Sequence, residues 1–260
     1  MPKKVVPESA RRRRRPTKNG EVLSERIIVE TALRMLAEHG AAGLTARRLG
    51  LALGADPSTL YRYFAGMDDL TLAIGAELIG RALRGWEATG AWRDDLRALG
   101  LRIHRAYLAH PQAAVLTASR VTGREQEIAA DEAILAVLRT AGFPDPEAVR
   151  IYHTFIDQSL AFAALDAASM ALPRAAREAD EHMWESAYAQ LSDASHPHIA
   201  ATADLLAARM NHSAYPAALE MILDSAAGRL ARANANGLSA IELQADGLPA
   251  HGLPRPPSAG

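Results

Sequence analysis

Residues 44–64 read LTARRLGLALGADPSTLYRYF, and this stretch decides the fold of the N-terminal part of the chain. Thr45 gives the start signal for a short helix that has Leu49 and Leu53 on its inner side. Gly54 ends this helix after about two turns. Glycine suits the turn that follows, because a residue without a Cβ can adopt a positive φ without strain. The pattern predicts a short helix and a tight turn.

A second short helix is predicted from Asp56 to Phe64. Asp56 is a suitable N-cap, and Pro57 takes the first helical position, where its missing N–H costs nothing. Leu60 and Phe64 are four residues apart and are predicted to lie together on the buried side. The two helices form a helix-turn-helix pattern.

The outward face of the second helix carries groups that can read DNA. It presents Pro57, Ser58, Thr59, Tyr61, Arg62 and Tyr63. Hydroxyl side chains can reach base edges or phosphates, tyrosine can cover a thymine methyl, and arginine can pair with guanine or phosphate. A recognition helix in a major groove has this composition. The alternative is an ordinary helical hairpin with a polar surface.

A preceding helix completes a three-helix unit. Ser24 is a plausible N-cap, and Gly40 is the expected C-cap. Between them, one face is apolar and comprises Ile27, Ile28, Ala32, Leu33, Leu36 and Ala37.

Charge is distributed unevenly along the chain, although the net charge is only −1. Residues 1–66 contain 13 Lys or Arg and 6 Asp or Glu, so the acidic excess lies in the remainder. A basic first quarter on an acidic body indicates contact with a polyanion. The basic run is Arg11, Arg12, Arg13, Arg14 and Arg15, in an arm (1–22) predicted to be disordered. A solvated basic tail is the alternative.

The rest of the chain is predicted to be helical, which makes the whole protein all-α. Helical spans are expected over 92–109, 111–121, 124–141, 145–169, 174–191, 198–210 and 215–235, after a helix from Asp68 or Asp69 to about Trp86. Residues 238–260 are rich in proline and glycine and are predicted to be a flexible tail. The expected units are 1–22, 23–68, 69–237 and 238–260.

Composition excludes several classes of function. The chain has no cysteine, so disulfides, thiolate zinc sites and cysteine nucleophiles are absent. No apolar run approaches the roughly 18 residues that a transmembrane helix needs, and a cytoplasmic protein is the expectation. No convergent acid–base or metal site is evident, since His196 and His198 lack a nearby fixed carboxylate. Neither catalysis nor a cofactor is predicted.

Residues 26–70 resemble the tetracycline-repressor-like (TetR) family of regulators. The resemblance rests on IVETAL (28–33), EHG (38–40), LTARRL (44–49) and STLYRYF (58–64) followed by DDL (68–70). It implies an all-α homodimer with three N-terminal DNA-binding helices and a larger C-terminal domain that dimerises and holds an inducer. It also implies DNA contacts by Thr45, Arg47 and Arg48 and by Thr59, Tyr61 and Tyr63.

One position departs from the family pattern. Many members have a phosphate-binding lysine just before the Asp-Asp-Leu run, and this chain has Met67. The arginine run at 11–15 could compensate by contacting phosphates or a minor groove.

The C-terminal part offers candidates for a dimer interface and a ligand pocket. Apolar stripes at 151–165 and 218–230 suit either dimer helices or internal core packing, and the family resemblance favours the dimer. The expected pocket residues are Trp86, Tyr107, Tyr152, Phe155, Met183, Trp184 and Tyr188, since ligand pockets are mostly apolar with few polar groups.

The leading hypothesis is therefore a repressor that a small lipophilic ligand releases from a palindromic double-stranded DNA operator. A regulator or architectural protein without a ligand response is an alternative. A helical enzyme with a DNA-binding appendage is another, and it would need a catalytic constellation that the sequence does not show.

Overall fold

The computed structural model describes residues 22–188, 190–210 and 212–245, and this part of the chain contains helices and no β-strand. In chain order the elements are α1 (Glu25–Gly43), α2 (Ala46–Leu53), the 3₁₀ turn η2 (Pro57–Arg62), α3 (Met67–Leu83), α4 (Trp92–Leu108), α5 (Pro111–Thr117), α6 (Glu125–Thr140), α7 (Asp145–Ala171), α8 (Arg174–Met183), the π-helical turn η3 (Trp184–Tyr188), α9 (Pro197–Arg209) and α10 (Tyr215–Ala245). The all-α prediction is confirmed. The arginine run at 11–15 lies outside the described residues.

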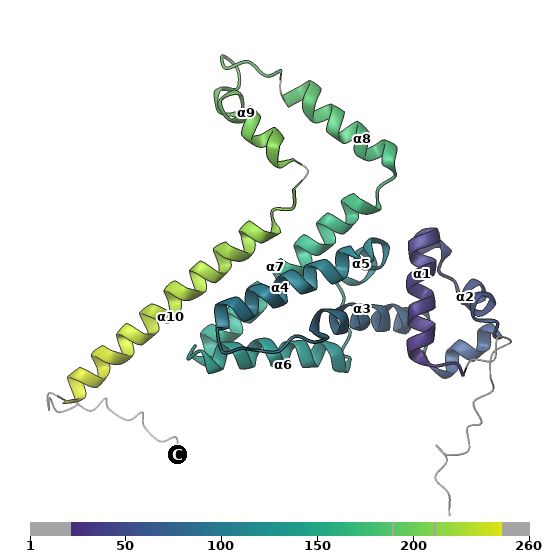
Figure 1. Ribbon diagram of the computed structural model, residues 1–260, viewed down its shortest axis with the longest axis horizontal. Helices are drawn as coiled ribbons and strands as arrows, with labels where there is room; N and C mark the ends of the chain where they lie inside the picture. Colours follow the sequence, from purple (N-terminus) through teal and green to yellow (C-terminus); the bar gives the residue numbers. More distant parts are fainter. Residues whose placement is uncertain (1–21, 189, 211, 246–260) are drawn as a thin grey trace, which may run out of the picture.

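The N-terminal unit consists of α1, α2 and η2, at one end of the molecule (Figure 1). The Ser24 hydroxyl caps α1 by accepting from the Ile27 N–H at 3.3 Å. Gly40, with φ 65°, interrupts α1 near its end, at the expected position. The apolar side chains of the three elements share one core, with Leu49 and Leu60 both buried.

Helix α3 connects the N-terminal unit to the rest of the chain. It packs against α1 on one side and against α4, α5 and α6 on the other (Figure 1). Leu70, Ile74 and Leu78, spaced four residues apart, are all buried. One continuous helix therefore packs against both the N-terminal unit and the helices of the C-terminal part.

The C-terminal body comprises α3 to α7 together with α10. Helix α7 lies at its centre and packs against α4, α5, α6 and α10. At Gly100 of α4, an added Cβ would meet the Tyr215 hydroxyl at 2.5 Å. Glycine at this position leaves room for the Tyr215 side chain of α10.

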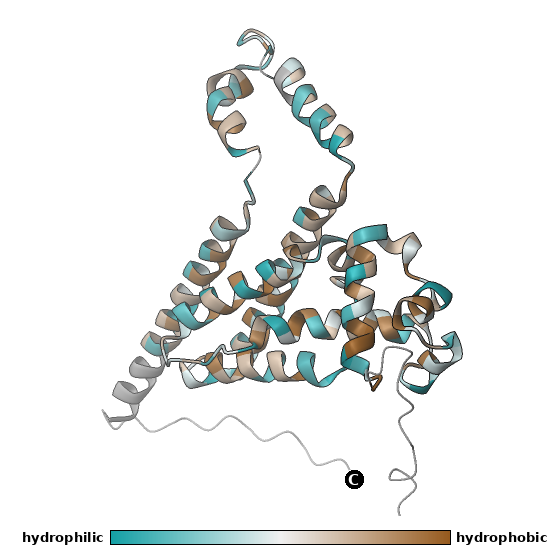
Figure 2. Cartoon of the chain, turned by 45° about the vertical axis from the view of Figure 1, so that its right-hand side comes forward, coloured by the Kyte–Doolittle hydropathy of each residue, from teal (hydrophilic) through white to brown (hydrophobic). Residues whose placement is uncertain are grey.

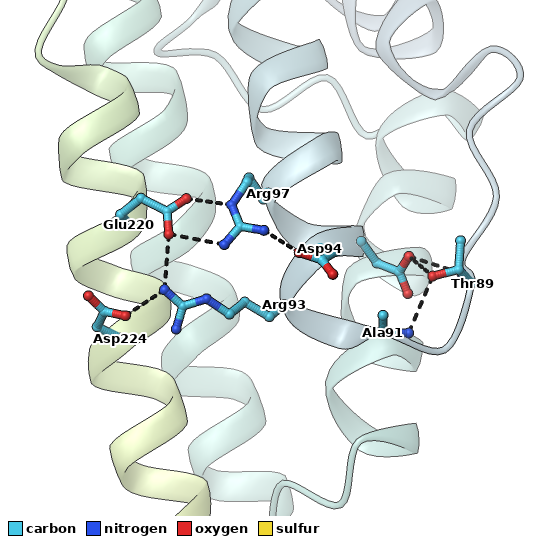
Figure 3. A network of polar contacts seen from close by, with 8 residues as sticks. Thr89, Ala91, Arg93, Asp94, Arg97, Glu220 and Asp224 are labelled. Carbon is cyan, nitrogen blue, oxygen red and sulfur yellow. Dashed lines mark hydrogen bonds and ion pairs between the residues drawn. The ribbon is translucent and has the colours of Figure 1, made fainter.

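Ion pairs fasten α10 to α4 (Figure 3). Arg93 and Arg97 of α4 both donate to the Glu220 carboxylate, and Arg93 also reaches Asp224. The hydrogen bonds from Arg97 and Arg93 hold the pKa of Glu220 at about 2. The network lies along the first half of the long α10 helix.

An excursion of the chain, formed by α8, η3 and α9, projects from the body between α7 and α10 (Figure 1). No residue of α8 or α9 is buried, and α8 is largely hydrophilic (Figure 2). Its expected boundaries, 174–191 and 198–210, agree with the observed ones except that a π-helical turn replaces the end of the first helix.

Three expectations about element bounds are corrected. The second helix of the helix-turn-helix pattern is a 3₁₀ turn, with i→i−3 hydrogen bonds such as Tyr63 N–H to the Leu60 carbonyl, and it ends at Arg62, two residues early. Helix α3 ends at Leu83, short of Trp86, where Gly85 with φ 70° turns the chain.

The third correction concerns α10. This helix runs to Ala245, so the segment 238–245 is helical rather than the start of a flexible tail. The segment LSAIELQA contains good helix formers and no proline, whereas the first proline of the tail is Pro249. The remaining expected tail, 246–260, lies outside the described residues.

No single helix in the described ranges is long and apolar enough to cross a membrane. Helix α7 reaches the required length and hydropathy only when it is taken together with α8 and η3, and these are separated from it by a bend of 106°.

Candidate nucleic-acid interface and ligand cavity

Helix α2 presents the two arginines of the predicted interface to solvent. The Thr45 hydroxyl caps it by accepting from the Arg48 N–H at 3.3 Å. The side chains of Thr45, Arg47 and Arg48 are exposed, whereas Leu49 and Leu53 are buried. The capped end and its basic side chains therefore lie on one accessible surface, which suits an anion near a helix N-terminus.

A close backbone approach fixes the angle between α2 and η2. Gly54 has φ 62°, as its place in the predicted turn requires. Gly50 is equally constrained, because an added Cβ would lie 3.0 Å from both the Ala55 carbonyl oxygen and the Pro57 nitrogen. Sequence reasoning missed Gly50, since a lone glycine inside a helix does not reveal what packs against it.

The turn η2 displays most of the predicted recognition residues. Asp56 caps it by accepting from the Ser58 N–H at 2.8 Å, and hydrogen bonds from the Ser58 side chain and from this N–H lower the pKa of Asp56. Ser58, Tyr61 and Arg62 are exposed, with Tyr61 at 58%. The side chains of Pro57 and Thr59 are half-buried. The phenol of Tyr61 is therefore available to a partner on this surface.

Tyr63 differs from the other predicted recognition residues. Its side chain is half-buried, and its hydroxyl donates to the Leu23 carbonyl oxygen at 2.7 Å. That bond connects η2 to the residue before the α1 cap. The hydroxyl proton of Tyr63 is therefore used in an intramolecular hydrogen bond. Only the lone pairs of the hydroxyl oxygen and the edge of the ring remain for contact with DNA.

The first turn of α3, next to this surface, is tied to the C-terminal body. Met67 is half-buried against the core. Asp68 forms two hydrogen bonds with Arg120, at 2.9 and 3.0 Å, and Asp69 accepts from Arg124 at 2.6 Å. Both arginines come from the connection between α5 and α6. Sequence reasoning missed these pairs, because their members are more than 50 positions apart.

A cavity of about 600 Å³ lies in the C-terminal body, between α3, α4, α6, α7 and the α5–α6 connection. Its apolar walls include Ile79, Ile103, Ile156, Leu160 and Ala164. Its polar lining includes Arg120, Glu127, Asp131, Tyr152, His153 and Asp157. A cavity of this size and composition can hold a drug-sized molecule. Because Arg120 also pairs with Asp68, the wall of the cavity reaches the start of α3.

Of the predicted pocket residues, only Tyr152 lines this cavity. Tyr107 and Phe155 are buried core residues outside the cavity lining, and Trp86 lies beyond the end of α3. Met183 and Tyr188 are exposed on the excursion. The side chain of Trp184 lies outside the described part. Aromatic residues mostly fill the core here, while isoleucine, leucine and alanine line the cavity.

The polar wall contains a carboxylate that is partly shielded from water. Burial raises the pKa of Asp131, and the hydrogen bond with Tyr152 offsets part of this effect. Burial and the same hydrogen bond raise the pKa of Tyr152. Within the described ranges, no group of three or more His, Asp or Glu side chains is placed to hold a metal ion.

The predicted dimer stripes are partly buried within the chain and partly exposed. Ile151 and Phe155 of α7, and Leu219 and Leu223 of α10, are buried within the chain, as core packing requires. Other apolar side chains of the same helices are exposed, namely Val149, Leu165, Met170 and Met221. The two helices therefore keep an apolar outer surface.

Two parts of the chain match families of known proteins. Residues 28–74 match the family described as bacterial regulatory proteins, tetR family, and residues 85–227 match the tetracyclin repressor-like C-terminal domain. An HTH-type transcriptional regulator from Saccharopolyspora erythraea is 33% identical over 123 residues, which cover 47% of this chain and 52% of that protein. The matches span about half the length of such curated relatives.

Solved structures share the fold. A possible TetR family transcriptional regulator from Streptomyces coelicolor A3(2) is 26% identical, with a TM-score of 0.65 over 78% of this chain and 98% of that chain. BioQ, solved with its double-stranded DNA operator, is 29% identical, with a TM-score of 0.51 over 57% of this chain and 88% of that chain. The first likeness extends well beyond the N-terminal unit.

Proposed function

Because the chain belongs to the TetR family of bacterial regulators, we propose that it is a transcriptional repressor, released from a palindromic operator by a small lipophilic ligand. The observation that supports DNA binding most directly is the surface formed by the start of α2 and η2. There Arg47, Arg48, Arg62 and Tyr61 are all exposed. Arginines neutralise phosphates, and a tyrosine ring can contact a base edge.

The proposed working form is a homodimer in the cytoplasm, where the operator is found. Two copies joined through the exposed apolar faces of α7 and α10 would present two recognition turns to successive major grooves. A two-fold protein predicts a two-fold operator. Selection of bound sequences from a random DNA pool tests this, and selected sites without two-fold symmetry would exclude the dimeric reading.

The ligand response is supported by the cavity and by its connection to α3. Arg120 lines the cavity and pairs with Asp68, next to the DNA-binding unit. A ligand that displaces the α5–α6 connection would change how α3 and the N-terminal unit are held. If the ligand prefers that state, it lowers operator affinity by population shift. An architectural protein has no use for such a cavity.

The test of DNA binding is the Tyr61→Ala variant. Tyr61 is exposed and makes no hydrogen bond within the described part of the chain, so its loss leaves the fold intact. We expect about a tenfold or greater loss of operator affinity in fluorescence anisotropy, since a good base contact is worth ~1–3 kcal/mol. Arg174→Ala, on the excursion, is the matched surface control. Unchanged operator affinity for Tyr61→Ala would refute the proposed interface.

A further inference from the structure

The charges that line the cavity are predominantly negative. Glu127, Asp131 and Asp157 face it, against the cationic Arg120 and the titratable His153. The walls between them are apolar, formed in part by isoleucine and leucine side chains from α3, α4 and α7. A wholly neutral lipophilic ligand gains nothing from such carboxylates, and it leaves them partly desolvated without compensation.

Two of the charged groups are occupied within the fold. Arg120 forms a two-point pair with Asp68, outside the cavity. Glu127 accepts from the Thr122 N–H and hydroxyl, both at 2.9 Å, and from the Gly123 N–H at 2.6 Å. Glu127 therefore caps the start of α6 and has little capacity for a ligand.

The remaining carboxylates, Asp131 and Asp157, have no ion-pair partner among the described residues. Asp131 is half-buried and accepts a hydrogen bond from Tyr152. Burial raises the pKa of Asp131, because water solvates this carboxylate incompletely. The charge of Glu127 also raises the pKa of Asp131, and that of His153 lowers it. Asp157 is exposed at the edge of the cavity, and its charge raises the pKa of Tyr152.

We propose that the ligand of this cavity is an amphipathic cation, with an apolar body and one protonated amine or other onium centre. The positive centre lies beside Asp131, where the carboxylate pairs with it and the ring of Tyr152 offers its π-face. The apolar body fills the space against Ile103, Ile156 and Leu160. This assignment rests on the proposed ligand-responsive function and specifies the chemical class of its ligand.

The opposite assignment is an anionic ligand. An anion in the cavity would have to take Arg120 from Asp68 and would lie among three carboxylates. The exposed Arg120–Asp68 pair is weak enough for such competition. The geometry favours the cation, and the experiment decides between the two charges.

The experiment compares two probes of the same shape and opposite charge, tetraphenylphosphonium and tetraphenylborate. Each displaces the neutral apolar dye N-phenyl-1-naphthylamine from the full-length protein, and release of operator DNA is measured in parallel. We expect the phosphonium to displace the dye at lower concentration than the borate. In Asp131→Asn, we expect about tenfold weaker phosphonium binding and unchanged dye binding, because one charge-assisted contact is worth ~1.5 kcal/mol or more.

Matched variants complete the design. Glu132→Gln removes an exposed carboxylate that does not line the cavity, and it should leave both probes unaffected. Asp157→Asn, at an exposed site, provides a second test if Asp131→Asn unfolds, and it should also weaken the phosphonium. Thermal unfolding followed by circular dichroism identifies a variant that does not fold.

The outcomes separate this inference from the proposed function. Equal or tighter binding of the borate, or phosphonium affinity unchanged in both aspartate variants, overturns the cationic assignment and leaves a ligand-responsive repressor in place. If neither the dye nor any probe binds the wild-type protein or releases DNA, the ligand response itself is refuted, and the cationic assignment with it.

Discussion

At the scale of single residues, Tyr61 and Tyr63 show how two similar positions acquire different roles. The sequence predicts both on the outward face of one short helix. In the 3₁₀ turn that forms, Tyr61 is exposed, while Tyr63 turns back and donates to the Leu23 carbonyl oxygen. The period of a 3₁₀ turn differs from that of an α-helix, so a face assigned from 3.6-residue spacing is correct only in part.

The Tyr63→Phe variant tests the structural role of that hydroxyl. It leaves the carbonyl of the buried residue Leu23 without its donor, and we expect the unfolding free energy to fall by about 1 kcal/mol. Urea unfolding measures the change. Tyr61→Phe is the matched control, because its exposed hydroxyl has no partner in the described part, and it should leave stability unchanged. Equal effects of the two changes would contradict the assignment.

At the scale of elements, caps and breaks were the most predictable features. Ser24, Thr45 and Asp56 cap the elements that they were expected to cap, and Gly40 and Gly54 have the positive φ that their places require. Most helix bounds in the C-terminal body followed from proline and glycine positions. These signals are local, so one sequence reveals them.

Gly50 represents what local signals do not reveal. The Gly50→Ala variant would place a Cβ 3.0 Å from the backbone of Ala55 and Pro57, and it would push η2 away from α2. We expect a loss of about 1–3 kcal/mol in stability from overpacking, with weaker operator binding, measured by urea unfolding and anisotropy. Gly228→Ala, where the nearest atom is an arginine side chain at 3.5 Å, should be neutral or slightly stabilising. A harmless Gly50→Ala would contradict this account.

The anchoring of α10 by Arg93 and Arg97 predicts a dependence of stability on pH. The pKa of Glu220 is about 2 in the folded protein and near 4.5 ordinarily. The ionised form is therefore favoured by folding. Its stabilisation is complete above pH 4.5 and is lost as the pH falls towards 2.

Glu220→Gln should flatten the unfolding free energy between pH 4.5 and 2, as measured by urea unfolding at several pH values. High salt should diminish the difference from wild type, because the pairs are partly exposed. Glu132→Gln, which removes an exposed carboxylate outside any ion pair in the described ranges, serves as control. The same pH profile in wild type and Glu220→Gln would refute the prediction.

At the scale of the whole molecule, the all-α fold class could be predicted, but the cavity could not. Helical periodicity was sufficient for the fold class. The cavity is bounded by Ile79, Asp131 and Tyr152 from three helices, and its connection to α3 depends on Arg120 and Asp68, 52 positions apart. Such convergence is decided by packing, and aromatic content is a poor guide to it.

The excursion has a consequence for the covalent continuity of the chain. The chain on its two sides is joined by a hydrogen bond, since the Asp166 carboxylate of α7 accepts from the Ser213 hydroxyl, which lies between α9 and α10. Tyr215, Leu219 and Leu223 of α10 are buried in the body, whereas no residue of α8 or α9 is buried. We therefore expect that an unbroken chain between Leu172 and Ser213 is not needed to hold α10 in the body.

Limited proteolysis should cut within the excursion first and leave two fragments that migrate together in size-exclusion chromatography and still bind operator DNA. Separation of the fragments under native conditions would show that the unbroken chain is required. If they stay associated, the segment is a natural insertion point for a reporter domain, because foreign sequence there would not interrupt the core.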